Sequence, residues 1–553
     1  MSIIQVHSRR EYDEFVKHPS HICFVRCQAV RDPDGSTRNA YDVVFWCPER
    51  QQLFTILDYE RCPFPVPPRS FHASPGITQV GPAPINIRVT MERPIVGLLD
   101  YLNAVLSVKR YAFVRDRLQP GSVIDCACGT GYGSNILLQR DDVTALCGVD
   151  LSDEALEFSR LVVRDPRAVF RATLPDEQVD NIVSLETLEH APEPYQFMGE
   201  LCARLKPGGR AIISVPTERW HGSHLNPFHL SNWNHARFSR FVAAFFQSVS
   251  IYFLRLSMAG PDTFSASELA ATPWPDPQNE GFVAVLTQLR PQPRKRIVLR
   301  RSEGLGEVLW AAPLAAQLKA EEPERDVVVV TDEVEAFFNN PHTDLLMNTT
   351  WSGGVDIDLD RVEQVDRQMP LLQAYQQRAG MPPLAGVPEL YLSEADLQFA
   401  QQLPANREVI ACHALAAPAG QVWPRESWVR LVEILRDHQY LVLLLGRGEQ
   451  YDLRVEGTFS VADRKLSLSQ LAALIHRARF FIGPAASGLC EVARAVGRPA
   501  VVIGEHEASL ATPLECLPRA ASLENAAGAA AQETTSLNAV LTLVAELLGA
   551  SAD

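Results

Sequence analysis

The 553-residue sequence lacks long apolar runs, C-x-x-C cysteine pairs and a basic start followed by a short hydrophobic segment. A membrane-spanning helix needs about 20 consecutive apolar residues, and no stretch comes near that length. We therefore expect no transmembrane segment. The absence of a signal-peptide pattern further predicts a cytoplasmic protein.

Cysteine is present but forms no framework. The eleven cysteines are an odd number without regular spacing, so we expect reduced thiols rather than a disulfide scaffold. Cys23, Cys27, Cys47 and Cys62 are enough for a four-thiolate zinc site, but without C-x-x-C knuckles the favoured interpretation is ordinary strand cysteines. No metal ion is predicted at any site.

Positive charge is scarce, with 51 Lys and Arg against 66 Asp and Glu and a net charge of −15. A nucleic-acid partner needs a concentrated basic surface, so we expect none. Hydrophobic residues make up 46% and charged residues 21%, as in soluble globular proteins. The length predicts several domains.

Four segments follow from the patterns of strands, helices and breakers. Residues 1–85 form an accessory β-containing region, with strands at 22–30 and 41–46 before a Pro-rich stretch. Residues 90–288 form an α/β domain. The segment LRPQPRKR, residues 289–296, forms a linker. A second α/β domain, with two Rossmann-like halves, occupies 297–553.

Within 90–288, strands and helices alternate as in a doubly wound, Rossmann-like sheet. Helical spacing runs from Ile95 to Leu118, and a turn is expected at Pro207-Gly208-Gly209. Expected strands are 122–126, 145–149, 180–185 and 210–215, expected helices 153–163, 193–205 and 236–246, and strand-like runs at 248–254 and 281–287 supply an antiparallel end. In the second domain, one helix is expected over 306–320.

A glycine-rich loop follows the first of these strands. The strand ends in Asp125, and Gly129, Gly131 and Gly133 then lead into a helix, so a ligand can approach bare backbone. A dinucleotide fingerprint would have a glycine where Ser134 stands. Asp150 ends the next strand, 21 positions after Gly129, where a carboxylate can accept hydrogen bonds from both ribose hydroxyls.

The segments VIDCACGTGYGSNILL, CGVDLSDEALEFSR, DNIVSLETLEHAPEP and LKPGGRAIISVPT resemble the successive motifs of class I S-adenosylmethionine-dependent methyltransferases. KRYAF at 109–113 and NPFHL at 226–230 are similar to methyltransferases found with bacterial surface-glycan genes. The resemblance implies S-adenosyl-L-methionine as the cofactor. The cofactor-binding residues it implies are Asp125, Ala127, Gly129, Thr130, Gly131, Tyr132, Gly133, Asp150, Leu151 and Glu186, and the acceptor-binding residues are Arg110, Tyr111 and Asn226.

Residues 171–180 depart from the family pattern. They are short and lack the usual acidic partner of the adenine amino group, for which Asp176 is a weak substitute. Methyl transfer to a hydroxyl gains from a base, and His190 is the first candidate and His229 the second. A capping or core histidine is an equal alternative for His190.

The segments IVLRRSEGLGEVLWAAPLAAQLK, VWPRESWVRLVEIL and LAALIHRARFFIGPAASGLCEVARAVGRPAVV resemble heptosyltransferase-like glycosyltransferases of the two-Rossmann, GT-B-like type. This resemblance implies Glu307 as a base, with Gly306, Ser487 and Gly488 as substrate-binding residues. Departures fall on polar positions, since Glu307 replaces an Asp, Gln421 replaces a cation, and the PAASG loop lacks an Asp. These changes weaken stabilisation of a diphosphate leaving group.

The leading hypothesis is therefore an enzyme that O-methylates a sugar in glycan or glycoconjugate biosynthesis, fused to a domain that transfers or binds a nucleotide sugar. The alternative is a methyltransferase whose C-terminal domain is a catalytically silent binding or assembly module. Hydride transfer by a bound dinucleotide is a third hypothesis, and it is disfavoured. The expected partners are a sugar or glycoconjugate acceptor and a nucleotide sugar, and a homo-oligomer is compatible with the sequence.

Overall fold

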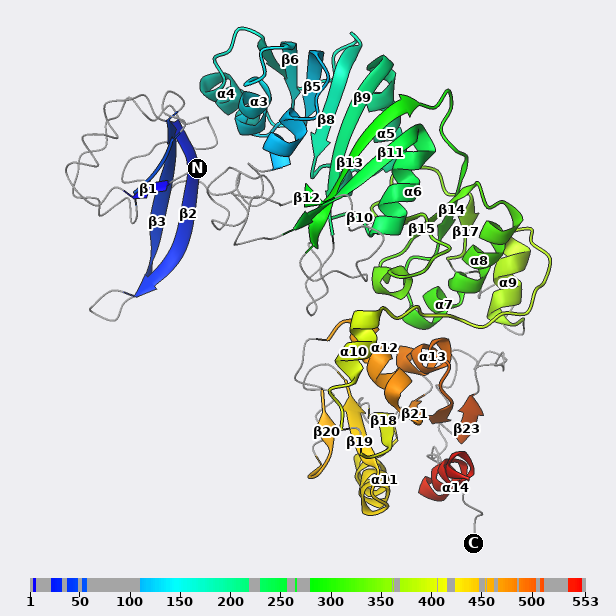
Figure 1. Cartoon of the computed structure of the whole chain (residues 1–553). Coiled ribbons are helices and arrows are strands. Elements are labelled where there is room, and N and C mark those ends of the chain that lie inside the picture. Colours follow the sequence, from blue (N-terminus) through cyan, green and yellow to red (C-terminus); the bar gives the residue numbers. More distant parts are fainter. Residues whose placement is uncertain are drawn as a thin grey trace, which may run out of the picture.

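The computed structural model describes residues 3–5, 21–31, 37–47, 52–56, 110–217, 229–255, 264–265, 279–360, 362, 369–404, 406–414, 423–446, 453, 455–461, 466–484, 487–503, 508–511 and 536–549 (Figure 1). Within these residues the strands form four separate sheets. None of the helices found there is long and apolar enough to cross a membrane.

The N-terminal region contains a four-stranded sheet. Its strands are β1 (Ile3–Gln5), β2 (His21–Arg31), β3 (Thr37–Cys47) and β4 (Gln52–Ile56), in the order β1-β4-β3-β2. The two strands expected at 22–30 and 41–46 are thus present, paired antiparallel as β2 and β3. Of the four cysteines considered for zinc, Cys62 and the side chains of the other three lie outside the described part of the structure.

An eight-stranded sheet follows, in the order β12-β11-β13-β9-β8-β5-β6-β7. The parallel strands are β5 (Gly121–Cys126), β6 (Val143–Val149), β7 (Ala168–Arg171), β8 (Val179–Leu185) and β9 (Leu205–Pro216). The antiparallel end consists of β11 (Phe246–Arg255), β12 (Phe264–Ser265) and β13 (Asn279–Leu289). The predicted Rossmann-like sheet is therefore confirmed, including its antiparallel end.

The helices of this domain start where their sequences provide caps. They are α3 (Tyr132–Leu137), α4 (Asp153–Val162), α5 (Pro194–Ala203) and α6 (His235–Phe245). The side chains of Ser152, Glu193 and Asn234 each accept a backbone N–H of the first turn of α4, α5 and α6. Such caps satisfy amide groups that have no partner inside the helix.

The expected turn at Pro207-Gly208-Gly209 is instead part of β9. Leu205 pairs with Val179 of β8 and Arg210 pairs with Asn181, so five positions of β9 oppose two positions of β8. The extra residues form an irregularity that glycine permits, because Gly208 has a φ of +80°. Proline and glycine here interrupt the ladder without ending the strand.

The second α/β domain begins with a five-stranded sheet in the order β10-β16-β15-β14-β17. Its elements are β14 (Arg296–Arg300), α7 (Leu305–Leu309), α8 (Ala311–Glu321), β15 (Asp326–Val330), the 3-10 helix η5 (Val334–Phe337), β16 (Leu345–Met347), β17 (Ile357–Asp358) and α9 (Leu371–Arg378). The single helix expected over 306–320 is divided at Trp310. Pro313 explains the break, because its ring clashes with the carbonyl four residues earlier in a continuous helix.

The last sheet has six strands in the order β20-β19-β18-β21-β22-β23. Its elements are α10 (Glu394–Ala400), β18 (Val409–His413), α11 (Arg425–Asp437), β19 (Leu441–Leu445), β20 (Phe459–Ser460), α12 (Leu468–Arg477), β21 (Phe480–Pro484), α13 (Gly488–Ala495), β22 (Ala500–Ile503), β23 (Ala508–Ala511) and α14 (Leu537–Leu548). Strands β18 to β22 are parallel, as in a Rossmann-like half. Two such halves were expected.

The first and second α/β domains share a hydrophobic core. Phe238 and Phe241 of α6 belong to one buried cluster with Val328, Leu345 and Met347 from the five-stranded sheet. In Figure 1, α6 lies between the eight-stranded sheet and strands β14 and β15. One strand also crosses over, since β10 (Ser231–Asn232) follows β9 in the chain but pairs with β16 of the second domain.

The segment expected to be a linker is bound along its length. Backbone N–H groups of Arg290 and Arg294 donate to the carbonyls of Phe245 and Ala244 at the end of α6, at 2.7 and 3.1 Å. These bonds hold the connection between β13 and β14 against the first domain. The two domains are therefore packed on each other rather than joined by a free chain.

Candidate functional site

The predicted cofactor residues meet at the carboxyl ends of three neighbouring strands. Asp125 lies in β5, Asp150 directly follows β6 and Glu186 directly follows β8. The chain runs outward from β5 to β6 and β7, and then crosses to β8 on the other side of β5. Ligands of doubly wound sheets bind in the crevice at such a switch point.

The glycine loop after β5 has one open side. Gly129 and Gly131 have φ values of +54° and +77°, which L side chains rarely adopt. A Cβ on Gly133 would lie 2.1 Å from the Tyr111 ring, so only glycine fits there. A Cβ on Gly129, in contrast, would meet no atom within 4 Å. The backbone at Gly129 is thus accessible to a ligand.

Asp150 ties this loop to the end of β6. Its Oδ2 accepts the N–H of Gly129 and its Oδ1 accepts the N–H of Ser152, both at 2.9 Å. The side chain is held in one orientation beside the open face of the loop. Each carboxylate oxygen can accept a further bond. The next residue, Leu151, is 90% exposed, which leaves a large apolar side chain beside the carboxylate for a ligand to cover.

Asp125 lies beneath the loop and is fully buried. It accepts hydrogen bonds from the hydroxyls of Tyr111 (3.1 Å) and Ser134 (2.6 Å). Burial raises the pKa of its carboxyl to about 7, although both hydrogen bonds act in the opposite direction. Ser134, which distinguishes the loop from a dinucleotide fingerprint, thus serves as a hydrogen-bond donor to Asp125.

Tyr111 and Arg110 support the loop and the β8 end. Tyr111 is buried, and its ring lies edge-on to that of Tyr132 with centroids 5.3 Å apart. Arg110 is buried too and pairs with the carboxylate of Glu186 at 3.3 Å. Both were expected to bind the acceptor, whereas the structure places them beside the predicted cofactor residues.

Glu186 is held by a residue that the sequence did not single out. Ser214 of β9 donates its hydroxyl to Glu186 Oε1 at 2.7 Å and accepts the Glu186 backbone N–H at 3.0 Å. Glu186 has a φ of +51°, an uncommon conformation for a non-glycine residue. Strain of this kind persists where neighbouring groups fix the conformation, and it is frequent at functional sites.

The remaining predicted residues of this site are placed less directly. Thr130 is buried in the loop, and Ala127 has a φ of +60°. The carboxylate of Asp176 is fully exposed and 3.8 Å from Arg204, on the surface rather than at the strand ends. Asn226 lies outside the described residues.

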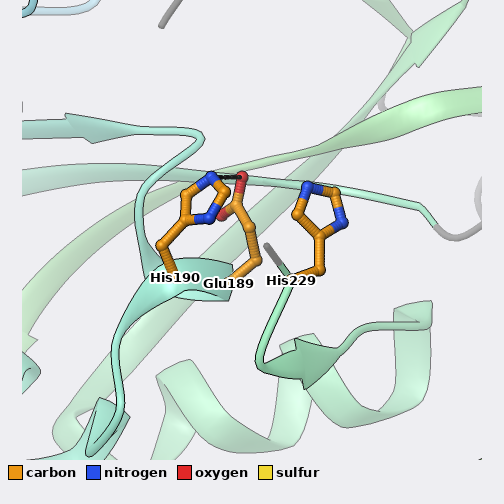
Figure 2. A group of neighbouring side chains, drawn as sticks. All are labelled: Glu189, His190 and His229. Atoms are coloured by element: carbon orange, nitrogen blue, oxygen red, sulfur yellow. Dashed lines mark ion pairs between the residues drawn. The ribbon is translucent and has the colours of Figure 1, made fainter. Parts of the chain in front are cut away.

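The two candidate bases lie together. His190 ends the 3-10 helix η4 (Leu188–His190) and His229 stands two residues before β10, yet their ring centroids are 5.2 Å apart. Figure 2 shows Glu189 beside them, with its Oε1 3.7 Å from His190 Nε2. The Glu189 side chain is 2% exposed and that of His190 35%. The sequence analysis named the two histidines as catalytic candidates but not Glu189, although Glu189 lies in the segment from Glu186 to His190 that the resemblance places on the methyl-transfer side.

The second candidate site lies where the two halves of the second domain meet. Glu307 and Gly306 are in the short helix α7, and a Cβ on Gly306 would lie 3.1 Å from Cγ of Glu491 in α13. Glu491 accepts a hydrogen bond from Trp310 Nε1 at 3.1 Å, and burial raises the pKa of its carboxyl. The structure thus brings predicted Glu307 near a second carboxylate that the sequence analysis did not identify.

Ser487 and Gly488 form the start of α13, as expected. The Ser487 hydroxyl is 2.7 Å from Nδ1 of His413 and also accepts the backbone N–H of Leu489. A Cβ on Gly488 would lie 3.2 Å from Cβ of Leu305. The space beside the predicted phosphate-binding helix start is therefore bounded by an apolar side chain from the other half.

Family models match two parts of the chain. Residues 101–260 match a model described as a methyltransferase domain, and residues 352–540 match glycosyltransferase family 9 (heptosyltransferase). The predicted combination of a methyltransferase domain with a heptosyltransferase-like domain is confirmed.

Curated relatives match the first of these parts. A probable S-adenosylmethionine-dependent methyltransferase of Mycolicibacterium smegmatis is 28% identical over 173 residues, which are 29% of this chain and 65% of the relative. A ubiquinone biosynthesis O-methyltransferase of Bordetella avium is 36% identical over 108 residues, 18% of this chain and 44% of the relative. The chain thus spans less than two thirds of these relatives. Both matches agree with the predicted cofactor.

Solved glycosyltransferases are also similar to part of the chain. The glycosyltransferase family 9 protein of Veillonella parvula is 17% identical with a TM-score of 0.37, covering 46% of this chain and 97% of that protein. The ADP-heptose lipopolysaccharide heptosyltransferase II of E. coli is 16% identical with a TM-score of 0.30, covering 46% of this chain and 97% of that protein.

Proposed function

Because this chain joins a methyltransferase domain to a glycosyltransferase family 9 domain, we propose that it methylates a hydroxyl of a sugar in a glycan or glycoconjugate. The observation that carries the methyl-transfer part is the open backbone at Gly129 beside the fixed carboxylate of Asp150. The sugar acceptor is proposed from the attached family 9 domain.

The residues at the switch point fit S-adenosylmethionine. Asp150 would accept hydrogen bonds from the ribose hydroxyls, and the exposed Leu151 would pack against the face of the adenine ring. The loop from Ala127 to Gly133 would hold the methionine part. Asp125 and Glu186 would complete the cofactor side. When bound, the cofactor supplies a methyl group on a positively charged sulfur.

The paired imidazoles would act on the acceptor. Methyl transfer is an in-line displacement, so the chain contributes mainly by aligning donor and acceptor, and a base removes the hydroxyl proton as the bond forms. His190 is the first candidate for this base because its side chain is partly open to solvent. His229 is the second, and its ring lies edge-on to that of His190.

For the family 9 domain, we propose binding or transfer of a nucleotide sugar, with Glu307 as the base of a transfer reaction. Fusion of the two domains would raise the local concentration of a shared intermediate. A catalytically silent C-terminal domain is the second candidate function. It is favoured by the position of Leu305 beside the start of α13, where a diphosphate would bind.

Calorimetric titration of the full chain tests both parts. We expect S-adenosylhomocysteine to bind at one site per chain, and a panel of ADP-, GDP-, UDP- and dTDP-linked sugars to identify the second ligand. Binding of S-adenosylhomocysteine but of no nucleotide sugar would favour the silent C-terminal domain. Absence of binding by S-adenosylhomocysteine would contradict the methyltransferase assignment.

Two glutamates four positions apart, one before α7 and one in it, test sugar transfer. Glu307→Gln should abolish turnover of the sugar donor identified above while methyl transfer persists, because only the base is removed. Glu303→Gln is a matched control, since Glu303 is exposed four residues earlier. Equal turnover in Glu307→Gln and wild type would remove Glu307 from the mechanism.

Location and assembly remain proposals as well. We infer that the enzyme lies in the cytoplasm, where nucleotide sugars and S-adenosylmethionine are made. A homo-oligomer stays a prediction.

A further inference from the structure

We propose that Glu189, His190 and His229 bind one divalent transition-metal ion on the acceptor side of the methyltransferase domain (Figure 2). One ligand atom from each side chain can be chosen so that all three lie within 4.8 Å of one another. This departs from the sequence-based expectation of no metal. The role of the ion in methyl transfer, though not its binding, rests on the function proposed above.

The chemistry of the three donors suits such an ion. Two imidazoles and one carboxylate form a set that binds Zn²⁺, Mn²⁺, Fe²⁺ or Co²⁺ and leaves coordination positions open. Donors about 2.1 Å from one tetrahedral ion stand about 3.4 Å apart. The 3.7 Å between Glu189 Oε1 and His190 Nε2 is close to that spacing. The three donor atoms lie within 4.8 Å of one another, so the set would draw together as the ion binds.

The three donors differ in burial, so the site has a buried side and an open side. The Glu189 carboxylate is 2% exposed, and a buried charge is stable only when it is paired or coordinates a metal. A divalent ion would place an opposite charge beside this carboxylate. The His190 side chain is 35% exposed, so the ion would be open toward solvent on that side. An acceptor could reach it there.

The backbone holds the donors in place before any ion arrives. Glu189 and His190 belong to η4, whose turn is closed by a 3.0 Å bond from His190 N–H to the Thr187 carbonyl. The chain after His229 is tied back to η4, because Leu230 N–H donates to the Glu189 carbonyl at 2.7 Å. Preorganised ligands of this kind reduce the cost of binding a metal.

The ion would activate the acceptor hydroxyl. With both imidazoles bound to the ion, neither would act as the base described above. Coordination would instead lower the pKa of the bound hydroxyl, whose proton is released to solvent. The acceptor oxygen then forms a bond to the methyl carbon as the carbon–sulfur bond breaks, and that electron pair stays on sulfur. No change of metal oxidation state is involved. Open positions on one ion favour an acceptor with two neighbouring hydroxyls, as on a sugar ring.

Cobalt binding tests the site without relying on activity. The tag-free full chain, stripped with a chelator, is titrated with CoCl₂ by calorimetry and by the visible absorption of bound Co²⁺. We expect one ion per chain, and an affinity at least tenfold weaker in His229→Gln and Glu189→Gln. His438→Gln is the matched control, because His438 is exposed at the end of α11 and should leave binding unchanged.

S-adenosylhomocysteine titration of every variant keeps the outcomes distinct. Retained binding of this product shows that a variant is folded, and His229→Gln serves if the buried Glu189 variant fails that check. Wild-type chain that binds no Co²⁺, or variants with unchanged affinity, would overturn the metal site. Cobalt binding without S-adenosylhomocysteine binding would leave the metal site standing and contradict the proposed methyl transfer.

Discussion

Tyr195 of the methyltransferase domain donates its hydroxyl to Oδ2 of Asp326 in the second domain, at 3.0 Å and 131 residues away in the chain. Asp326 is fully buried and also lies 3.2 Å from Arg294 Nη2 and 3.4 Å from Arg240 Nε. This charged cluster lies next to the hydrophobic core that the two domains share. Changes in this cluster should therefore change the free energy of unfolding of the joined domains.

Removal of Asp326 should destabilise the joined domains. Asp326→Ala leaves Arg294 without its buried counter-charge, whereas Arg240 keeps its ion pair with Asp344. Breaking a buried pair costs about 3 kcal/mol or more. Tyr195→Phe should cost about 1.5 kcal/mol, because a bond to a charged acceptor is lost. Denaturant unfolding measures both, with Glu324→Ala, at an exposed glutamate, as the control. Equal stability of Asp326→Ala and the control would contradict this account.

Asp150→Ala should weaken S-adenosylhomocysteine binding about 10- to 100-fold, which corresponds to losing charge-assisted bonds of about 1.5–3 kcal/mol. Asp150→Asn separates two effects, since its amide oxygen keeps one acceptor for the backbone but carries no charge. Asp153→Asn, at the exposed start of α4, is the control. Wild-type affinity in Asp150→Ala, measured by calorimetry, would sink the ribose role.

Ala127→Gly should stabilise the methyltransferase domain by up to about 1 kcal/mol. Ala127 has a φ of +60°, where a Cβ costs about 1–2 kcal/mol, and the greater freedom of glycine in the unfolded chain offsets part of this gain. The measurement is the thermal unfolding midpoint with and without S-adenosylhomocysteine. A lower midpoint for the glycine variant would show that the methyl group packs favourably.

Stability of the family 9 domain should fall as the pH falls from about 6.5 to about 4. Burial lowers the pKa of His413 to about 4, so the unfolded chain takes up a proton that the folded chain does not. The full effect is about 3 kcal/mol. Scanning calorimetry of His413→Asn, which can keep a hydrogen bond to Ser487, should show a shallower pH dependence. His438→Asn should behave like wild type.

A chain that ends after residue 288 should aggregate. It would lack Val328, Leu345 and Met347, which share a buried cluster with Phe238 and Phe241 of α6, and these phenylalanines would face water. Size-exclusion chromatography of the truncated chain measures this directly. A soluble monomer that binds S-adenosylhomocysteine with wild-type affinity would contradict the prediction.

Local sequence signals predicted much of the fold. The strand from 122 to 126, the glycines after it and the acidic residue at 150 each have a short-range physical cause, so the cofactor side was predicted residue by residue. Capping residues such as Ser152 likewise mark where helices begin. These features depend on neighbours within a few positions of the chain.

Features set by tertiary contacts were not predictable in the same way. The two residues of β10 carry no periodic pattern, and they become a strand only because β16 offers an unpaired edge. Glu189 joins two histidines through the fold, as His229 lies 40 positions away. Glu491 meets Gly306 and Glu307 only where α7 and α13 pack together.

The pairing of β10 with β16 also limits how this chain can have changed over time. A replacement methyltransferase domain would have to bring its own segment that matches the β16 edge, because β10 lies within the methyltransferase part of the chain. Exchange by recombination at the boundary near residue 289 would leave one sheet without its edge strand. A domain exchange at that boundary would therefore have to keep β10 and β16 together.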